Sequence, residues 1–158
     1  MTLLTARSAT AIVLLMTCIA APAWVANMAA QSSGTHQKLT FEGDTALWTV
    51  AIKPDKTADF EKFLGKLKEA LTKAGTPEAK AQLAGWKVVK MSSPGPEGTV
   101  IYTHVITPVN GADYNLLQIM YAVFTDPAEQ KALYDLYAGS LAKNLGIGSG
   151  KVAVDLSK

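Results

Sequence analysis

The alternation of side chains along residues 46–53 predicts a strand whose two faces are both apolar. A strand of this kind is typical of a sheet that is covered on both sides. Pro54 and Asp55 end it. One face carries Trp48, Val50 and Ile52, and the other carries Leu47, Thr49 and Ala51.

Helical periodicity begins at Thr57, which is placed to cap the first helix. Its apolar side chains recur at the three- and four-residue spacing of one helix face, and Gly75 ends the helix. Thr76 and Pro77 then predict a shorter helix that stops at Gly85, because a cap followed by proline is a start signal. The apolar stripe of the first helix consists of Phe60, Phe63, Leu64, Leu67 and Leu71.

Two further strands are predicted at residues 86–91 and 99–107, joined by a loop rich in proline and glycine. A connection this short favours an antiparallel pair. A helical segment opens at Asp113, and Asp126 with Pro127 starts another helix, whose apolar stripe runs to Leu141. Residues 146–150 are predicted as a linker, 152–156 as the last strand and 39–41 as a possible short strand.

The predicted order is therefore strand, helix, strand, strand, helix, strand. This order predicts an α+β, ferredoxin-like domain, with a four-stranded antiparallel sheet and helices on one face. No internal repeat or inner linker divides it, so residues 46–158 are interpreted as one domain and residues 31–45 as a flexible leader with that possible short strand.

Over residues 46–156 the order of elements resembles the dimeric α/β-barrel superfamily. This superfamily includes cofactor-free monooxygenases of the antibiotic-biosynthesis type, haem-degrading monooxygenases and stress-responsive proteins. The resemblance implies that one sheet face meets the helices and the other meets the sheet of a second copy. The extra helix near residues 77–84 departs from the family's pattern. The chain also looks like small exported bacterial proteins of unassigned function.

Residues 1–30 have the three parts of a cleavable secretory signal and run into the start of the leader. Arg7 supplies the positive charge, an uncharged apolar run follows, and small residues end at Ala23 and again at Ala30. Cleavage after Ala23 fits best, and cleavage after Ala30 is the alternative. The run is shorter than the ~20 residues that span a bilayer. The sequence therefore predicts a periplasmic or secreted protein with no stable membrane span after cleavage.

Removal of the signal changes which chemistry the chain offers. Cys18 is the only cysteine, so a processed chain has no disulfide, thiol nucleophile or thiolate metal site. Arg7 is the only arginine, and its loss leaves 14 lysines against 13 acidic residues. Such a balanced chain lacks the basic face of nucleic-acid-binding proteins, so we expect no nucleic-acid partner. With two histidines in all, no metal site is predicted.

His104 is the one candidate for catalysis. It lies in the middle of a predicted strand and shares its face with Val100, Tyr102 and Ile106, which predicts a covered position. A histidine there suits a haem ligand, a general base or a polar anchor in a ligand cavity. The alternative is a core histidine that is hydrogen-bonded to a neighbour.

Aromatic residues supply the candidate ligand site. Trp48, Tyr102 and Tyr121, together with His104, would suit a flat apolar ligand held between the sheet and the helices. Aromatic residues at strand and helix spacing are also typical of an ordinary core.

Three functions follow as hypotheses. The first is an exported binding or accessory protein for a small apolar ligand, self-associated as a homodimer and without a cofactor. The second is a cofactor-free or haem-linked monooxygenase-like enzyme of the dimeric α/β-barrel type. The third is a structural envelope protein without a small ligand. The sequence favours a protein that is not an enzyme.

Overall fold

The computed structural model describes residues 37–157 of the 158-residue chain. The predicted secretory signal, with its cleavage sites after Ala23 and Ala30, lies outside the described residues, as do residues 31–36 of the predicted leader. Within the described part, no helix is both long enough and apolar enough to cross a membrane.

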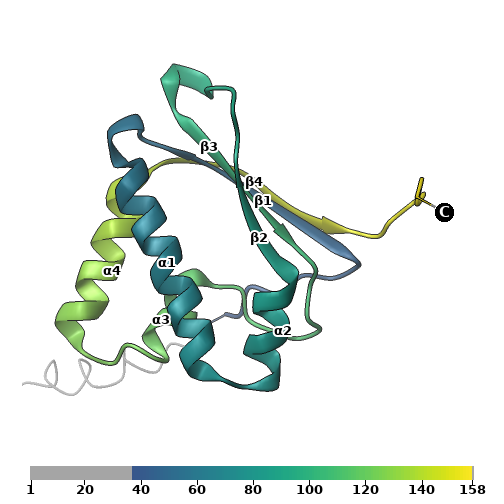
Figure 1. Ribbon diagram of the computed structural model, residues 1–158, viewed down its shortest axis with the longest axis horizontal. Coiled ribbons are helices and arrows are strands. Elements are labelled where there is room, and N and C mark those ends of the chain that lie inside the picture. Colours follow the sequence, from purple (N-terminus) through teal and green to yellow (C-terminus); the bar gives the residue numbers. More distant parts are fainter. Residues whose placement is uncertain (1–36, 158) are drawn as a thin grey trace, which may run out of the picture. The chain divides into compact units, whose positions relative to one another are not determined.

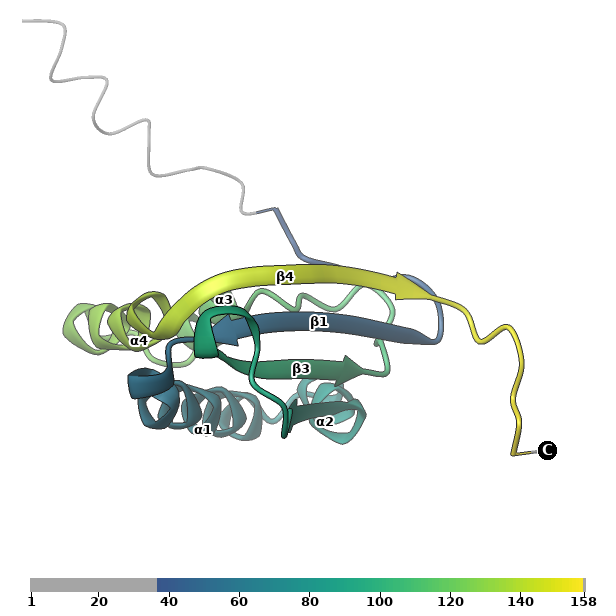
Figure 2. The ribbon, with the colours of Figure 1, turned by 90° about the horizontal axis from the view of Figure 1, so that it is seen from above.

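The described residues form a four-stranded antiparallel sheet in the order β2-β3-β1-β4. Its strands are β1 (Thr45–Ile52), β2 (Trp86–Lys90), β3 (Val100–Ile106) and β4 (Leu141–Gly150). The helices α1 (Thr57–Ala74), α2 (Pro77–Gly85), α3 (Leu116–Tyr121) and α4 (Pro127–Ser140) pack on the sheet (Figures 1 and 2). Residues 37–157 also contain the short 3₁₀ turns η1 (Pro54–Lys56) and η2 (Pro96–Gly98). The predicted α+β, ferredoxin-like fold is confirmed.

The signals that the sequence gives for helix ends act in the expected way. The Thr76 hydroxyl accepts a hydrogen bond from the Ala79 amide at 3.1 Å, which caps α2. The Asp126 carboxylate accepts one from the Glu129 amide at 2.8 Å, which caps α4. Gly75 ends α1 in the left-handed conformation that favours glycine, with a φ of 63°.

The core lies between the sheet and the helices. The side chains that face the helices come from alternate residues of β1 and β3, and they meet the apolar stripe of α1 and one side of α3. This burial holds the helices on one face of the sheet. The main core consists of Trp48, Val50, Ile52, Phe60, Phe63, Leu67, Ala70, Leu71, Ala79, Tyr102, Leu116, Met120, Phe124 and Leu133.

The last strand is not where the sequence places it. The pattern predicted a linker at residues 146–150 and a strand at 152–156, whereas β4 pairs with β1 through residues 141–150. Leu141, predicted as the end of the helical stripe, is the first residue of β4. The sequence misled because β4 is glycine-rich and almost entirely exposed, so tertiary pairing with β1 overrides its weak strand propensity.

Other local predictions also need correction. Thr57 lies inside α1 and gives no side-chain cap, because the turn η1 leads directly into the helix.

Residues 39–41 form no strand: the Leu39 amide donates to the Asp113 carboxylate at 3.0 Å. That contact also occupies Asp113, and Asn115 caps α3 in its place by accepting from the Gln118 amide at 3.2 Å.

Candidate functional site

Three aromatic side chains form a row across the helix-facing side of the sheet. Trp48 of β1 pairs with His104 of β3, and Trp86 of β2 lies on the other side of the same histidine. The imidazole of His104 stacks on the Trp48 indole, with ring centroids 5.2 Å apart and an interplanar angle of 26°. The Trp86 indole is tilted against it at 5.8 Å. We call Trp48, His104 and Trp86 the aromatic row.

One hydrogen bond sets the chemistry of His104. The Trp86 indole N–H donates to His104 Nδ1 at 3.0 Å. An indole N–H only donates, so Nδ1 accepts and the proton of the neutral ring is on Nε2. His104 is 0% exposed, and this burial lowers its pKa to about 4. The histidine is therefore neutral at physiological pH.

Two buried donors in the row lack partners. Within residues 37–157, neither the Nε2 atom of His104 nor the Nε1 atom of Trp48 has a hydrogen-bond partner. Each carries a proton, and an unsatisfied buried donor costs about 1–3 kcal/mol. An acceptor on a bound molecule that reached either atom would recover part of that energy. The aromatic row is therefore mostly apolar surface, with two N–H donors that have no partner.

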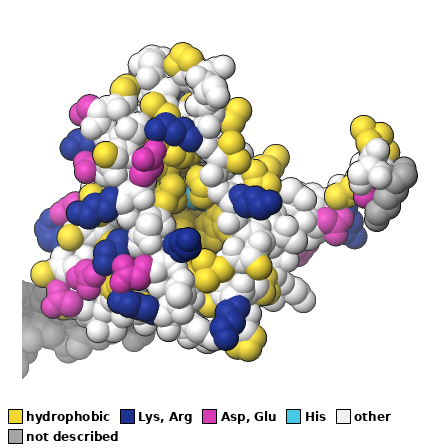
Figure 3. Space-filling model, viewed as in Figure 1, with side chains coloured by type: hydrophobic (Ala, Val, Ile, Leu, Met, Phe, Trp, Pro, Cys, Tyr) yellow, Lys and Arg dark blue, Asp and Glu magenta, His cyan; other side chains and the backbone are white. Residues whose placement is uncertain are grey.

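An open hollow of about 330 Å³ lies beside the Trp86 end of the row, between α1, α2 and β2. Figure 3 shows hydrophobic side chains inside a hollow on this face, with charged side chains around its rim. Trp86 connects the hollow to His104, since its ring lines the cavity while its N–H bonds the histidine. We call this cavity the α1–β2 hollow, and it is lined by Leu64, Leu67, Lys68, Leu71, Leu83, Trp86 and Val88.

Tyr102 lies next to the row but its hydroxyl is already engaged. It donates to the Glu61 carboxylate at 2.7 Å, and Lys90 donates to the same oxygen at 2.9 Å. The bond from Tyr102, followed by that from Lys90, lowers the pKa of Glu61. Burial, followed by the bond to Glu61, raises the pKa of Tyr102. The Tyr102 ring packs edge-on against Phe60, with centroids 4.9 Å apart, so this residue is part of the core beside the row.

A second hollow, of about 380 Å³, lies beside the Trp48 end of the row. It is formed between the β1–β4 side of the sheet and the helices α3 and α4, and two asparagines are among its lining residues. We call it the α3–β4 hollow, and it is lined by Leu39, Trp48, Asn115, Leu116, Leu117, Tyr137, Asn144 and Ile147.

The four residues predicted from the sequence do not form one group. Trp48 and His104 are in contact, and Tyr102 is the next residue on the helix-facing side of β3. Tyr121 instead ends α3, where burial, followed by the charges of Tyr134 and Asp135 on α4, raises its pKa. None of the four lines the α1–β2 hollow, and Trp48 lines the α3–β4 hollow.

Trp86 is the site residue that the sequence-based set of four omits. The sequence places Trp86 at the start of a predicted strand. Only the pairing of β2 with β3, however, brings the indole N–H of Trp86 to His104. Three of the four leucines that line the hollow, Leu64, Leu67 and Leu71, were predicted as the apolar stripe of the first helix. No sequence pattern separates a leucine that lines a cavity from one that fills a core.

Comparisons with known proteins give no relative from which a role can be carried over. No protein-family model matches the chain, and neither the curated proteins nor the solved structures yielded a match. Within the described residues, no cluster of three or more His, Cys, Asp or Glu side chains is placed to hold a metal ion. The function is therefore argued from the site alone.

Proposed function

We propose that this protein is an exported binding or accessory protein that holds a small, flat, apolar ligand in the α1–β2 hollow. The observation that carries the proposal is the apolar lining of that hollow, formed by leucines, a valine and the face of Trp86. Binding sites for small molecules are typically concave and apolar, with a few polar groups that fix orientation. At about 330 Å³ the hollow is at the small end of such sites.

The polar group that would orient the ligand is Lys68 at the rim. Its ammonium group is compatible with a ligand that combines an apolar body with one acidic or carbonyl group. The body would replace water on the leucine side chains, which favours binding by roughly 25 cal/mol for each Å² of apolar surface buried. Lys90 is less suitable, because Glu61 already neutralises it at 2.9 Å.

Adjacent residues of β2 allow a matched test of this proposal. Val88 lines the hollow, whereas Val89 points to the opposite face of the sheet. We expect Val88→Gln to weaken the binding of the fluorescent probe 1-anilinonaphthalene-8-sulfonate about tenfold or more, because the amide would face the apolar cavity. Val89→Gln should leave the affinity within about twofold. Fluorescence titration of the purified exported protein measures both constants.

Either of two outcomes would contradict the proposal. One is the absence of saturable probe binding to the unsubstituted protein at about 1 mM. The other is an equal loss of affinity in both variants. Native mass spectrometry of the protein from the exported fraction adds an independent readout, because a retained ligand appears as extra mass.

A monooxygenase-like enzyme is the second candidate, and His104 is its only support among the described residues. The bond from Trp86 argues against this role. With Nδ1 accepting that bond and the proton on Nε2, the ring has no free lone pair to take a proton or to ligate haem iron. Haem therefore does not fit His104 as it stands. A Soret band on adding haem that His104→Ala abolishes would favour the enzyme over the binding protein.

We also propose that the protein self-associates as a homodimer through the sheet face that points away from the helices, here called the open face. Apolar side chains on it are exposed: Leu47 by 51%, Val89 by 44% and Met91 by 47%. At the centre of this face Thr49 and Thr103 share a hydrogen bond of 3.2 Å, which satisfies one of the two hydroxyl donors when the face is covered. Exposed apolar patches of this kind mark interaction surfaces.

A further inference from the structure

The α3–β4 hollow differs from the α1–β2 hollow in the kind of polar group that it presents. The ammonium-bearing Lys68 lines the α1–β2 hollow, whereas no charged side chain of residues 37–157 lines the α3–β4 hollow. An ionised ligand group would therefore find no opposite charge there, which favours a neutral molecule. The polar side chains that line it are those of Trp48, Asn115, Tyr137 and Asn144.

Hydrogen bonds to the backbone orient both asparagine amides. Asn115 Oδ1 accepts from the Gln118 amide at 3.2 Å. Asn144 Oδ1 accepts from the Gly146 amide, also at 3.2 Å. A backbone N–H only donates, so it is the oxygen of each side chain, and not its NH2 group, that makes this bond. Neither NH2 group has a partner among the described residues, so each leaves two N–H donors available.

The two aromatic residues of the hollow also present donors. Trp48 is only 7% exposed, and its indole N–H has no partner within residues 37–157. The Tyr137 ring stacks on Phe63 with centroids 4.9 Å apart, which holds it in place. Burial raises the pKa of Tyr137, so its hydroxyl keeps its proton, and that hydroxyl bonds to no described residue. All four polar side chains therefore have N–H or O–H groups that are still to be satisfied.

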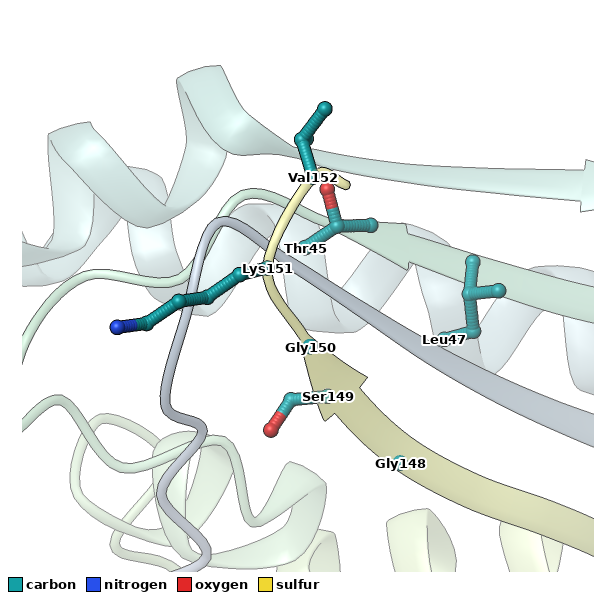
Figure 4. A pocket seen from close by; sticks show the side chains of 7 residues that line it. All are labelled: Thr45, Leu47, Gly148, Ser149, Gly150, Lys151 and Val152. Atoms are coloured by element: carbon teal, nitrogen blue, oxygen red, sulfur yellow. The ribbon is translucent and has the colours of Figure 1, made fainter. Parts of the chain in front are cut away.

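The floor of the α3–β4 hollow belongs to the core. Leu116 is 3% exposed and, like Trp48, is part of the main core cluster. A hollow of about 440 Å³ at the ends of β1 and β4 has no such floor, because none of its lining residues, Leu47 and Val152 among them, is buried (Figure 4). A buried apolar floor with a few fixed polar groups, and not volume alone, is typical of a binding site for a small molecule.

We infer that the α3–β4 hollow is a second binding site, which takes a small neutral molecule with a flat apolar body and at least one carbonyl oxygen. The body lies on Trp48 and Leu116, and the carbonyl oxygen accepts hydrogen bonds from the donors that line the hollow. A carbonyl oxygen has two lone pairs and no proton, so it matches a site that offers donors. The inference goes beyond the proposed function and is independent of the ligand in the α1–β2 hollow.

Reversing one donor provides the test, with the neutral naphthyl ketone prodan as the probe. Asn115→Asp replaces the NH2 group by an oxygen and keeps an oxygen to cap α3. Gln118→Glu makes the same change of charge at an exposed position of α3 that does not line the hollow. We expect Asn115→Asp to weaken prodan binding at least about tenfold, and Gln118→Glu to leave it within about twofold. Fluorescence titration of the full exported protein measures both dissociation constants.

Two tyrosines of α4 form a second matched pair, which changes no charge. Tyr137→Phe removes the hydroxyl and keeps the ring on Phe63. Tyr134 is 51% exposed and lies outside the hollow, so Tyr134→Phe is the control. We expect Tyr137→Phe to weaken prodan binding about fivefold, the effect of one lost hydrogen bond, and Tyr134→Phe to leave it within about twofold. Urea unfolding checks that all four variants remain folded.

The outcomes separate this site from the α1–β2 hollow. The inference is overturned if prodan shows no saturable binding at about 1 mM, or if its affinity is equal within both matched pairs. It is also overturned if Val88→Gln abolishes prodan binding, because the probe then lies in the α1–β2 hollow. We expect Asn115→Asp to leave the binding of 1-anilinonaphthalene-8-sulfonate unchanged. Failure of that anionic probe to bind at all would contradict the proposed function and leave the prodan site standing.

Discussion

At the scale of single residues, His104 makes stability depend on pH in a defined window. Burial lowers its pKa to about 4, below the 6.5 of an exposed histidine. Between these values the unfolded chain binds a proton that the folded chain does not, so stability falls as pH falls. We expect a loss of roughly 2–3 kcal/mol between pH 6.5 and 4.5, measured by urea unfolding.

A His104→Gln variant isolates that contribution. It does not titrate, and its pH dependence over this window should be nearly flat even if its absolute stability is lower. The lowered pKa values of Glu61 and Glu69 act in a separate window, since their contribution is present above pH 4.5 and is lost below it. A slope in His104→Gln equal to that of the unsubstituted protein would show that another group titrates.

The Trp86–His104 pair shows how much of the site could be read from residue identity. The sequence predicts that His104 is covered, and that is confirmed by its 0% exposure. Its partner was not predictable, because Trp86 and His104 are 18 residues apart and meet only through the pairing of β2 with β3. That contact decides which nitrogen carries the proton, and so which chemistry the histidine offers.

At the scale of elements, two glycines have opposite roles. Gly65 lies in the exposed middle of α1, where an added Cβ meets nothing within 4 Å. Gly43 precedes β1 with a φ of 90°, and an added Cβ would lie 2.4 Å from the carbonyl oxygen of Gly150. We expect Gly65→Ala to stabilise the protein by about 1 kcal/mol and Gly43→Ala to destabilise it by roughly 1–3 kcal/mol. Thermal unfolding of both variants measures the difference.

Each substitution serves as the control for the other, because both add one methyl group. The opposite sign is expected because helix propensity alone acts at Gly65, while the positive φ and the close approach of Gly150 both act at Gly43. Similar effects at both positions would contradict both the positive φ at Gly43 and its contact with Gly150.

The four strands show where a pattern is sufficient and where it is not. Strand β1 is recognisable because each of its faces is covered by apolar or short side chains, and the hairpin β2–β3 because its loop is rich in breakers. Strand β4 has only hydrogen bonds to β1 to define it, since its glycines carry no periodic signal. Residues 152–156 have the stronger alternating pattern but form no strand.

At the scale of the whole molecule, residues 37–157 should unfold as one unit. A second buried cluster lies beside the main core and consists of Phe41, Ala46, Ile106, Ala112 and Tyr114. Leu39 and Trp86 pack against both clusters, which joins them. We expect a single transition, with the same urea midpoint by tryptophan fluorescence and by far-ultraviolet circular dichroism. Two midpoints would mean that the clusters melt separately.

Local signals in this chain are enough to give its helices, its first three strands and their order, since caps, breakers and amphipathic periodicity act over a few residues. They therefore also predict the ferredoxin-like plan. Long-range contacts decide the rest: β4 exists because β1 offers it hydrogen bonds, and the α1–β2 hollow exists because helices and sheet do not close completely over Trp86. Such features depend on the distance between elements, a quantity that no local pattern encodes.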